Sequence, residues 1–413
     1  MPNTGLEREA AAALIGGGPT AGDRLRVGFI PLVDCAPLLV AHERGFAAAE
    51  GLDLDLVRET SWANIRDRIV LGHFDAAHML APMTIAANLA LGHLKAPVVT
   101  PFVLNLGGNA VAVSTAVHTR MREGGGAVSL ADPAATGAAL ARAIRAGAAR
   151  GEAPLTLAMV YPFSGQNYEL RHWLAAAGVD PDRDVRLVVV PPPFMVDALT
   201  AGQVDGFCVG APWPSLSVDA GVGCLVATKS AILPKSPEKV VGVRESWAER
   251  HPDRLARLVR ALDRAAAWCD DPANHEDLAA ILARPGYLGV PAEIVMRSLS
   301  GLLRTEQGGA AVHAPDYIIF HRGGANRPEA AHALWLATQM LRWGQAADPD
   351  AAYAAARRSF RADLYDAALG RGAAEPVTGL TPFDGLRFDA ADPAAYLAAL
   401  PRPPGPAAAP GDD

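Results

Sequence analysis

The sequence predicts an α/β protein, and three observations support this prediction. Strand-like and helix-like segments alternate from residue 25 to about residue 113. A second alternation runs from about residue 127 to residue 227, and from about residue 240 the pattern is mainly helical. Repeated alternation of this kind is typical of a largely parallel sheet with helices packed on its faces.

Glycines and changes of period mark the elements of the first alternation. The predicted elements are a strand at 25–32, a helix at 37–49, a strand at 52–58, a helix around 65–69, a strand at 75–78 and a helix from about residue 82. Gly51 stands where a helix C-cap is expected. Ile65 and Ile69 lie on one face of the second helix, which ends at Gly72.

The second alternation begins with an alanine-rich helix and continues in shorter segments. Its predicted elements are a helix at 136–150, a strand at 155–161, a helix at 168–177, a strand at 185–190, a helix at 195–201, and strands at 204–209 and 224–227. The later helices are predicted at 252–268, 273–282, 292–302, 328–343 and 351–361. Those later helices would cover the first unit and the connection between the two units.

Composition narrows the classes of function. Half of the 413 residues are apolar, and the net charge of −7 excludes a global basic surface for nucleic acid or an anionic membrane. No run of about 20 apolar residues is present to span a membrane. Residues 1–18 lack the basic region and the long apolar stretch of a secretory signal, so we expect a cytoplasmic protein.

The cysteines predict neither a metal site nor a redox motif. Cys35, Cys208, Cys224 and Cys269 lie far apart and show no C-x-x-C pair. We expect reduced, mostly buried thiols, with a Cys208–Cys224 disulfide as the less favoured alternative.

The most informative segment is 59–83. A strand, a turn and a helix whose start faces a cleft can present backbone N–H groups to a small anion. Trp62 falls in the predicted turn, where small polar residues are the usual choice. Trp62 is therefore either a packing residue or one wall of a ligand site.

Three segments resemble the nitrate/bicarbonate-binding proteins of ABC transporters, and most closely the soluble cytoplasmic nitrate/nitrite sensors of that family. They are GFIPLVDCAPL at 28–38, SWANIRD at 61–67 and GHFDAAHMLAPM at 72–83, within a resemblance that extends from about residue 25 to about residue 387. The resemblance implies a two-lobe, periplasmic-binding-protein-like fold (type II) with a ligand cleft between the lobes. The implied division is a flexible leader at 1–24, a first lobe from 25–125 and 240–388, a second lobe at 126–239, and a Pro- and Ala-rich, loosely held tail at 389–413.

The resemblance also implies the ligand-binding residues. It places ligand contacts at Trp62, Asn109, Gln166 and Lys239, with Asn64, Gly165, Gly210 and Pro212 around them. From the sequence alone, Asn109 would be a turn residue, Gln166 a solvated loop amide and Lys239 an exposed lysine. Gln166 also precedes the helix predicted at 168–177, whose first N–H groups could face an anion.

Two of these positions depart from the transporter-type pattern. Asn109 stands where Gln is expected and Gln166 where His is expected, although both remain amide donors. With no His at position 166, there is less reason to expect a proton-linked affinity. Lys239 favours nitrate or nitrite, because a lysine supplies charge for a monoanion, whereas the bicarbonate-binding relatives are expected to hold an acidic residue and a metal there. Lys235 is the fallback charge.

Catalytic and metal-binding motifs are absent from the sequence. There is no G-x-S-x-G, phosphate loop or dinucleotide fingerprint. His73, His78 and His93 do not have the spacing of a metal site and are interpreted as core or surface histidines. Asp34 and Cys35 suggest a dyad, but the sequence places no His to complete it. We therefore expect no enzyme, no metal and no cofactor, with nitrate or nitrite as the ligand.

Three hypotheses of function follow. The first, implied by the resemblance, is a cytoplasmic nitrate/nitrite sensor that regulates nitrate assimilation by holding an RNA-binding antiterminator protein inactive until the ligand binds. The second is a transporter-associated receptor for nitrate, bicarbonate or a sulfonate. The third is an enzyme on the same scaffold that acts on a small organic acid.

Overall fold

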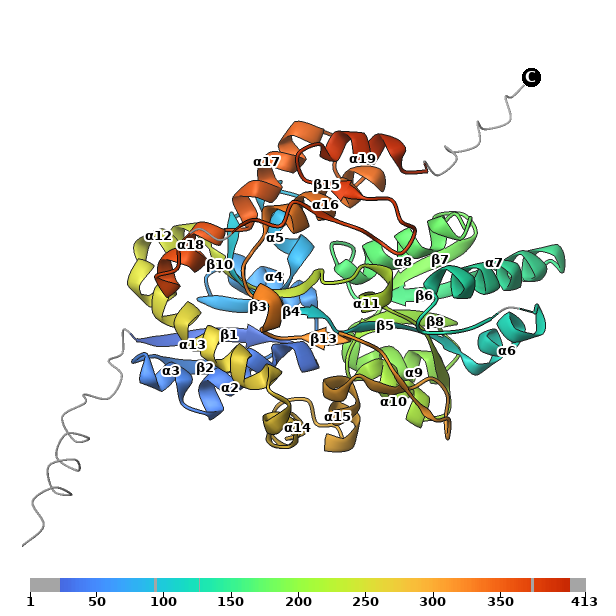
Figure 1. Cartoon of the computed structure of the whole chain (residues 1–413), viewed down its shortest axis with the longest axis horizontal. Helices are drawn as coiled ribbons and strands as arrows, with labels where there is room; N and C mark the ends of the chain where they lie inside the picture. Colours follow the sequence, from blue (N-terminus) through green and yellow to red (C-terminus); the bar gives the residue numbers. More distant parts are fainter. Residues whose placement is uncertain (1–22, 93–94, 126, 373–374, 402–413) are drawn as a thin grey trace, which may run out of the picture.

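The computed structural model describes residues 23–92, 95–125, 127–372 and 375–401. These residues form two lobes, each built on its own sheet, which lie side by side in Figure 1 with the blue and yellow segments in one and the green segments in the other. The predicted α/β class and two-lobe fold are confirmed. Most of the leader predicted at 1–24 lies outside the described residues, as do residues 402–413 of the predicted tail.

The first lobe contains a six-stranded mixed sheet in the order β13-β4-β10-β3-β1-β2. Its strands are β1 (Arg24–Phe29), β2 (Asp53–Arg58), β3 (Ala76–Leu80), β4 (Val98–Gly107), β10 (Pro237–Arg244) and β13 (Ile318–Ile319). β1 pairs in parallel with β2 and β3, whereas β10 runs antiparallel to both β3 and β4. The sheet is therefore mixed, because β10 brings the chain back from the second lobe into its centre.

Short helices follow the strands of the first lobe. They are η1 (Val33–Cys35), α2 (Ala36–Glu43), α3 (Phe46–Ala49), α4 (Trp62–Val70) and α5 (Ala81–Asn88). The single helix predicted at 37–49 is split at Gly45, whose φ of 74° is favourable for glycine. α4 begins after Ser61, whose side chain accepts a hydrogen bond from the Asn64 N–H.

The second lobe contains a five-stranded sheet in the order β7-β6-β8-β5-β9. Its strands are β5 (Asn109–Ser114), β6 (Leu155–Met159), β7 (Val185–Val189), β8 (Gly206–Gly210) and β9 (Gly223–Thr228). Its helices are α6 (Thr115–Glu123), α7 (Pro133–Ala149), α8 (Gly165–Ala176), η2 (Pro192–Phe194), α9 (Met195–Thr200), α10 (Trp213–Asp219) and α11 (Lys229–Ile232). The chain thus enters this sheet at Asn109, before residue 126, where the sequence analysis placed the change of lobe.

Two neighbouring crossings connect the sheets. β4 passes directly into β5 through Gly107 and Gly108, and β9 returns to β10 through α11. The Gly107 N–H donates to the Ser236 carbonyl oxygen at 3.1 Å, so the crossings are hydrogen-bonded to each other. Gly107 has a φ of 73°, and a Cβ there would clash with the Tyr317 carbonyl oxygen, so both conformation and space require glycine.

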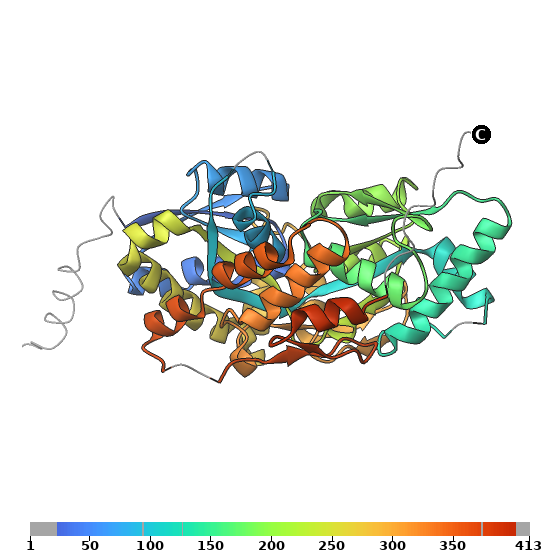
Figure 2. The ribbon, with the colours of Figure 1, turned by 90° about the horizontal axis from the view of Figure 1, so that it is seen from above.

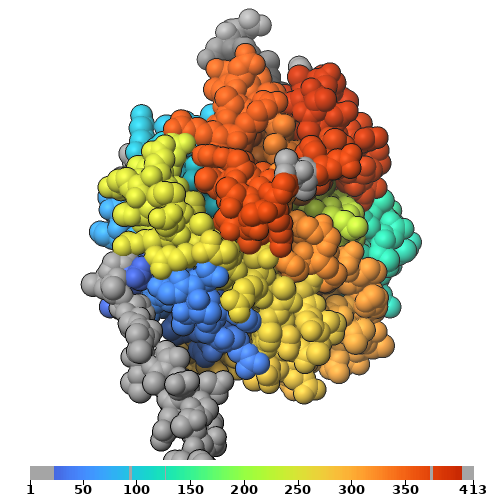
Figure 3. All heavy atoms as spheres, turned by 60° about the vertical axis from the view of Figure 1, so that its left-hand side comes forward, coloured from blue at the N-terminus to red at the C-terminus, as the bar shows by residue number. Residues whose placement is uncertain are grey.

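The region after β10 is mainly helical, as predicted. It contains α12 (Glu245–Arg250), α13 (Pro252–Asp270), η3 (Pro272–Asn274), α14 (His275–Leu282), α15 (Ala292–Ser300), η4 (Arg322–Gly324), α16 (Ala330–Arg342), α17 (Pro349–Ser359), α18 (Ala362–Leu369), and the hairpin of β11 (Leu302–Arg304) and β12 (Ala311–His313). α13 packs its buried Leu255, Leu258 and Leu262 against the first lobe, where it contacts α2 and α3. Figure 3 shows this yellow segment beside the blue N-terminal one.

Part of the segment expected to be a loosely held tail is packed. It contains β15 (Phe388–Asp389), paired with β14 (Gly379–Leu380), and α19 (Pro393–Ala399). Tyr396 is buried, and its hydroxyl accepts a hydrogen bond from Trp335 Nε1 at 3.3 Å. The large aromatic at position 396 gives this Ala-rich segment enough apolar surface to pack on α16. Figure 2 shows the orange and red helices on one side of both lobes.

All four cysteines are free and buried, which confirms the expected reduced thiols. Within the described part of the chain, no helix is long and apolar enough to cross a membrane.

Candidate functional site

The four side chains predicted to contact a ligand come from both lobes. Trp62 is the first residue of α4 and Lys239 lies in β10, while Asn109 opens β5 and Gln166 lies in the first turn of α8. Trp62 is 1% exposed and the other three side chains are completely buried. Trp62 is therefore the first residue of a helix capped by Ser61 rather than a turn residue, and Lys239 is a core residue rather than a surface lysine.

Each lobe contributes one pair of these side chains. In the first lobe, Lys239 Nζ lies 5.6 Å from the centre of the Trp62 ring, a distance typical of a cation–π contact. In the second lobe, Gln166 Nε2 donates a hydrogen bond to Asn109 Oδ1 at 3.1 Å. The two pairs are joined by charged residues that the sequence analysis did not include in the site.

On the first-lobe side, the joining residues surround Lys239. Lys239 Nζ lies 3.0 Å from Asp34 Oδ2 and 2.9 Å from Glu238 Oε1. Asp34 Oδ1 in turn lies 2.9 Å from His78 Nε2. His78 Nδ1 accepts the Ile30 N–H at 3.3 Å, so the hydrogen of a neutral His78 is on Nε2, facing Asp34.

On the second-lobe side, Lys229 continues the series. Its Nζ lies 3.2 Å from Glu238 Oε2 and forms a close ion pair with Glu169. Glu169 Oε2 accepts a hydrogen bond from Asn109 Nδ2 at 3.2 Å. His78, Asp34, Lys239, Glu238, Lys229 and Glu169 thus form a continuous buried series between the lobes, which we call the charged chain.

Local backbone structure explains how two adjacent residues of one strand both join the charged chain. Successive side chains of a regular strand point to opposite faces. The ladder between β10 and β4 shifts register on either side of Lys239, and this irregularity allows Glu238 and Lys239 to contact each other. Facing them, α8 begins at Gly165, where a Cβ would clash with the Glu238 carboxylate.

Burial and ion pairing determine the protonation of the first-lobe groups. Burial opposes the ionisation of Asp34, but Lys239 and His78 outweigh it and hold the pKa of Asp34 below its usual value. Burial likewise opposes the charge on Lys239, but Asp34 and Glu238 raise its pKa. Burial lowers the pKa of His78 despite the neighbouring Asp34, so His78 is neutral near pH 7.

The second-lobe groups differ from one another. Burial raises the pKa of Glu169 even though Lys229 opposes that shift. Glu238 is equally buried, but Lys239 and Lys229 together keep its pKa below its usual value. Glu169 is therefore the carboxyl group of the charged chain that gains a proton most readily.

Among the described atoms of the site, two buried polar atoms have neither a hydrogen bond nor an ion pair. Trp62 Nε1 is a donor, and Gln166 Oε1 is an acceptor. Leaving a buried polar atom unpaired costs about 1–3 kcal/mol, so such atoms indicate a site that a ligand completes. The indole N–H and the ammonium group of Lys239 are donors suited to the oxygens of an anion.

The residues predicted around the site have different positions. Asn64 donates from Nδ2 to Glu59 at 3.1 Å and so belongs to the start of α4. A Cβ at Gly210 would lie 3.2 Å from Asp34 Oδ2, which places this glycine against the charged chain. Pro212 immediately precedes α10.

Sequence reasoning missed five residues of the charged chain, and one signal could have pointed to one of them, Lys229. The missed residues are Asp34, His78, Glu169, Lys229 and Glu238. The chain contains only four lysines, and three of them fall between positions 229 and 239. Such clustering in an arginine-rich protein marks a segment that needs lysine, whereas nothing in the sequence places Glu169 beside it.

The structure completes the Asp34–Cys35 constellation with a histidine, contrary to the sequence analysis, but does not activate the thiol. His78 contacts Asp34, while burial and the nearby Asp34 raise the pKa of Cys35. A nucleophilic cysteine requires a lowered pKa. Across the described residues, no group of three or more His, Cys, Asp or Glu side chains could hold a metal ion.

Contacts between the lobes enclose the site. Arg66 of α4 donates to the Tyr161 hydroxyl at 2.8 Å, and the Val33 N–H donates to the Ala211 carbonyl at 2.8 Å. The predicted contact residues are therefore shielded from solvent in this arrangement of the lobes.

Comparison with known proteins agrees with this architecture. Residues 19–283 match the NMT1-like family. The chain is 32% identical over 403 residues to the nitrate/nitrite binding protein NrtA of Synechococcus elongatus, covering 93% of this chain and 88% of NrtA. It is 36% identical over 385 residues to the bicarbonate transport ATP-binding protein CmpC of the same species, covering 91% of this chain and 55% of CmpC. The chain spans about half the length of the ATP-binding relatives that it matches.

A solved structure shows the same fold. The crystal structure of the periplasmic nitrate-binding protein NrtA from Synechocystis PCC 6803 aligns with a TM-score of 0.84 and 29% identity, covering 92% of this chain and 98% of that protein. The similarity to binding proteins supports the expectation that the chain is not an enzyme.

Proposed function

Because the chain belongs to the NMT1-like family, we propose that it binds a small inorganic oxyanion, nitrate or nitrite, between its two lobes. The ligand contacts would be Trp62, Asn109, Gln166 and Lys239. The observation that carries this proposal is the unpaired Trp62 Nε1, buried beside the Lys239 ammonium group at the junction of the lobes. A planar anion needs converging donors and protection from water, and this junction supplies both.

The charged chain constrains how an anion binds. Lys239 already contacts Asp34 and Glu238, so a monoanion would be a third negative partner for the same ammonium group. Binding is favourable if a neighbouring carboxyl group takes up a proton or moves away. Glu169 is the group best suited to take up the proton, because burial already raises its pKa.

The choice of nitrate or nitrite over bicarbonate rests on the resemblance, which implies an acidic residue and a metal in bicarbonate-binding relatives at the position of Lys239. Relatives with either substrate in their names are similar to this chain. A lysine attracts any monoanion, but bicarbonate also carries a hydroxyl donor that needs an acceptor. Gln166 Oε1 is an unpaired acceptor, so bicarbonate is the competitor that the binding experiment must include.

We further propose that the protein acts as a cytoplasmic sensor in nitrate assimilation. The resemblance of segments 61–67 and 72–83 to cytoplasmic nitrate/nitrite sensors supports this role. The ligand would favour the enclosed arrangement of the lobes, and that arrangement would bind an RNA-binding antiterminator less tightly. Nitrate-dependent release of a co-purified regulator from the native protein is the expected result, and a complex insensitive to nitrate and nitrite would contradict it.

The second candidate function is a substrate receptor of an ABC transporter, and the names of the similar proteins favour it. Cell fractionation with an antibody against the native protein separates the two roles. Recovery with the cytoplasmic fraction supports the sensor, whereas recovery with the periplasmic fraction supports the receptor.

Isothermal titration with nitrate, nitrite, bicarbonate and sulfate tests the binding proposal. We expect saturable binding of nitrate or nitrite, loss of at least about tenfold in affinity in Lys239→Met, and a smaller loss in Trp62→Phe, which keeps the packing but removes the donor. Lys95→Met is the control, because Lys95 is an exposed lysine that belongs neither to the predicted ligand contacts nor to the charged chain. Unchanged nitrate affinity in a folded Lys239→Met variant would refute the assigned site.

A further inference from the structure

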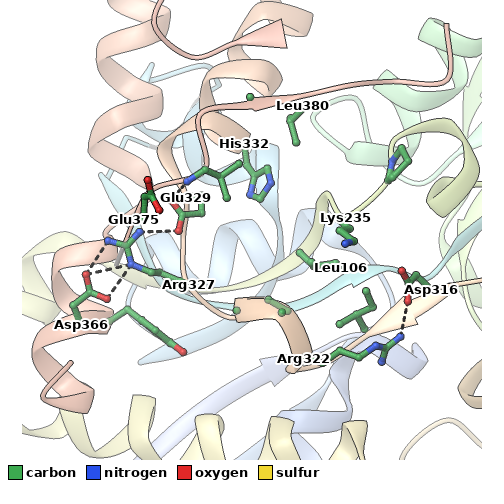
Figure 4. Close-up of a pocket in the computed structure, with 18 of the residues that line it drawn as sticks. Leu106, Lys235, Asp316, Arg322, Arg327, Glu329, His332, Asp366, Glu375 and Leu380 are labelled. Carbon is green, nitrogen blue, oxygen red and sulfur yellow. Dashed lines mark hydrogen bonds and ion pairs between the residues drawn. The ribbon is translucent and has the colours of Figure 1, made fainter. Parts of the chain in front are cut away.

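A cavity of about 900 Å³ lies outside the charged chain. Its walls come from the end of β4, the loop before β10, β13, η4, α16, α18 and the segment around β14 (Figure 4). None of the four predicted ligand contacts lines it. A volume of this size suits an organic molecule far larger than nitrate.

The cavity touches both crossings between the lobes. Leu106 precedes Gly107 in the first crossing, and Pro234 and Lys235 belong to the second. Ile319 of β13 completes this wall, and the Ile319 position pairs with Leu106 in the sheet. A molecule bound here would contact the two segments whose geometry sets the arrangement of the lobes.

Most charged groups around the cavity already have partners. Arg327 is paired with Asp366 at 2.8 Å and with Glu329 at 2.7 Å. Arg322 is paired with Asp316 at 3.0 Å. Those arginines and carboxylates are paired with one another and form the frame of the cavity rather than free charges.

Three groups at the cavity have no such partner in the described structure: the Lys235 ammonium, His332 Nδ1 and the Glu375 carboxylate. Figure 4 shows Glu375 beside Arg327, across the cavity from Lys235.

Among the described lining residues, Lys235 is a cation with no hydrogen bond or ion pair. His332 is 93% buried, and its Nδ1 has no hydrogen-bond partner. Burial lowers the pKa of His332 to about 4, so the ring is neutral near pH 7 and can donate from one nitrogen. Figure 4 shows both side chains in the space between Leu380 and Leu106.

We propose that this cavity is a second binding site, for a small organic anion. Its acidic group contacts Lys235 and His332. Its hydrocarbon part packs against Leu106, Ile319 and Leu380. The lysine supplies the charge, and the unpaired imidazole nitrogen supplies a directed hydrogen bond. The three apolar side chains are buried at the cavity wall and favour a ligand with a hydrocarbon part.

Ligand-observed NMR and isothermal titration on the full chain test this proposal. The probes are benzoate and phenyl phosphate as organic anions, benzyl alcohol as a neutral analogue, and inorganic phosphate as an anion that has no hydrocarbon part. We expect the organic anions to bind, and the other two probes to bind at least about tenfold more weakly. Lys235→Met and His332→Phe should each weaken benzoate or phenyl phosphate severalfold, whereas Lys95→Met, an exposed lysine that does not line the cavity, should not.

The outcomes separate this site from the nitrate site. Failure of both organic anions to bind, or equal binding by Lys235→Met and the unsubstituted protein, overturns the proposal. Equal binding of benzoate and benzyl alcohol also overturns it, because the cavity would then select only for apolar surface. Trp62→Phe, which keeps the packing at the nitrate site, serves as a further control: it should weaken nitrate binding but leave benzoate binding intact.

Discussion

Lys239 Nζ lies 3.0 Å from a carboxylate oxygen of Asp34, and both side chains are completely buried. The cation expected to attract the ligand is therefore already neutralised by its own protein. Such a pair has a large desolvation cost, and removing one partner leaves the buried charged chain with one uncompensated charge. This relationship links the stability of the first lobe to the chemistry of the site.

The first prediction concerns this pair. Lys239→Met and Asp34→Asn should each destabilise the protein by about 3–5 kcal/mol, because each leaves an uncompensated buried charge. The double variant should be less destabilised than the sum of the two single variants. Urea unfolding of the four proteins in a double-mutant cycle measures the difference. Simple additivity would show that the two groups do not interact energetically.

The second prediction is that nitrate affinity falls as the pH rises. Burial raises the pKa of Glu169, and a bound anion would add negative charge near it and favour the protonated carboxyl further. Binding should therefore take up a proton, with affinity highest below the pKa of Glu169 in the ligand-free protein and declining as the pH rises through that pKa. His78 does not supply this proton near neutral pH, because burial lowers its pKa.

Titration in two buffers of different ionisation enthalpy at each pH detects this proton uptake. Glu169→Gln, which keeps the shape and the polar atoms, should flatten the profile. An affinity independent of pH in the unsubstituted protein, without proton exchange with the buffer, would disprove the role of Glu169. The expectation drawn from Gln166 alone, of little proton linkage, did not take the neighbouring carboxyl groups into account.

The third prediction is that Gly165→Ala impairs binding. A Cβ at position 165 would clash with the Glu238 carboxylate and would lie 3.1 Å from Glu169 Oε1, so it would push apart the two carboxylates that Lys229 joins. We expect a loss of nitrate affinity of about tenfold or more, with the total helix content unchanged by circular dichroism. Gly286→Ala is the control, because a Cβ there contacts nothing. Unchanged affinity in Gly165→Ala would show that this part of the charged chain is not coupled to the ligand.

Much of the fold could be predicted from local sequence patterns. The strand at 52–58 and the helix at 252–268 were placed to within two residues at each end, because apolar periodicity and flanking Gly or Pro residues define them. β10 was not predicted as a strand of the first sheet, because its partners β3 and β4 lie more than 100 residues earlier. The packing of α19 was missed for a different reason. Its Pro- and Ala-rich composition is typical of a loosely held segment, and the contact of its single aromatic residue with α16 cannot be read from that composition.

The site was predictable only where a motif could be recognised. The resemblance led to Trp62, Asn109, Gln166 and Lys239, and the structure places them as two pairs. The resemblance did not lead to Glu169. In the sequence this residue is an ordinary polar residue of a predicted helix, and only the fold brings Lys229 beside it. Buried charge networks depend on contacts between distant segments, and the sequence pattern of any one segment does not contain them.

The last prediction concerns one of the hydrogen bonds that bridge the two lobes. Arg66 donates to the Tyr161 hydroxyl at 2.8 Å, joining α4 to the loop that precedes α8. Tyr161→Phe removes this hydrogen bond but keeps the ring, so it should destabilise the enclosed arrangement by about 0.5–1.5 kcal/mol. Because only that arrangement completes the site, nitrate affinity should fall by about twofold to tenfold, mainly through faster dissociation. Stopped-flow measurement of association and dissociation checks this.

Tyr287→Phe is the matched control for the Tyr161→Phe variant. The Tyr287 hydroxyl contacts Glu43 within the first lobe, so its loss should leave nitrate dissociation unchanged. Equal dissociation rates for Tyr161→Phe and the unsubstituted protein would show that the lobes are held together by other contacts.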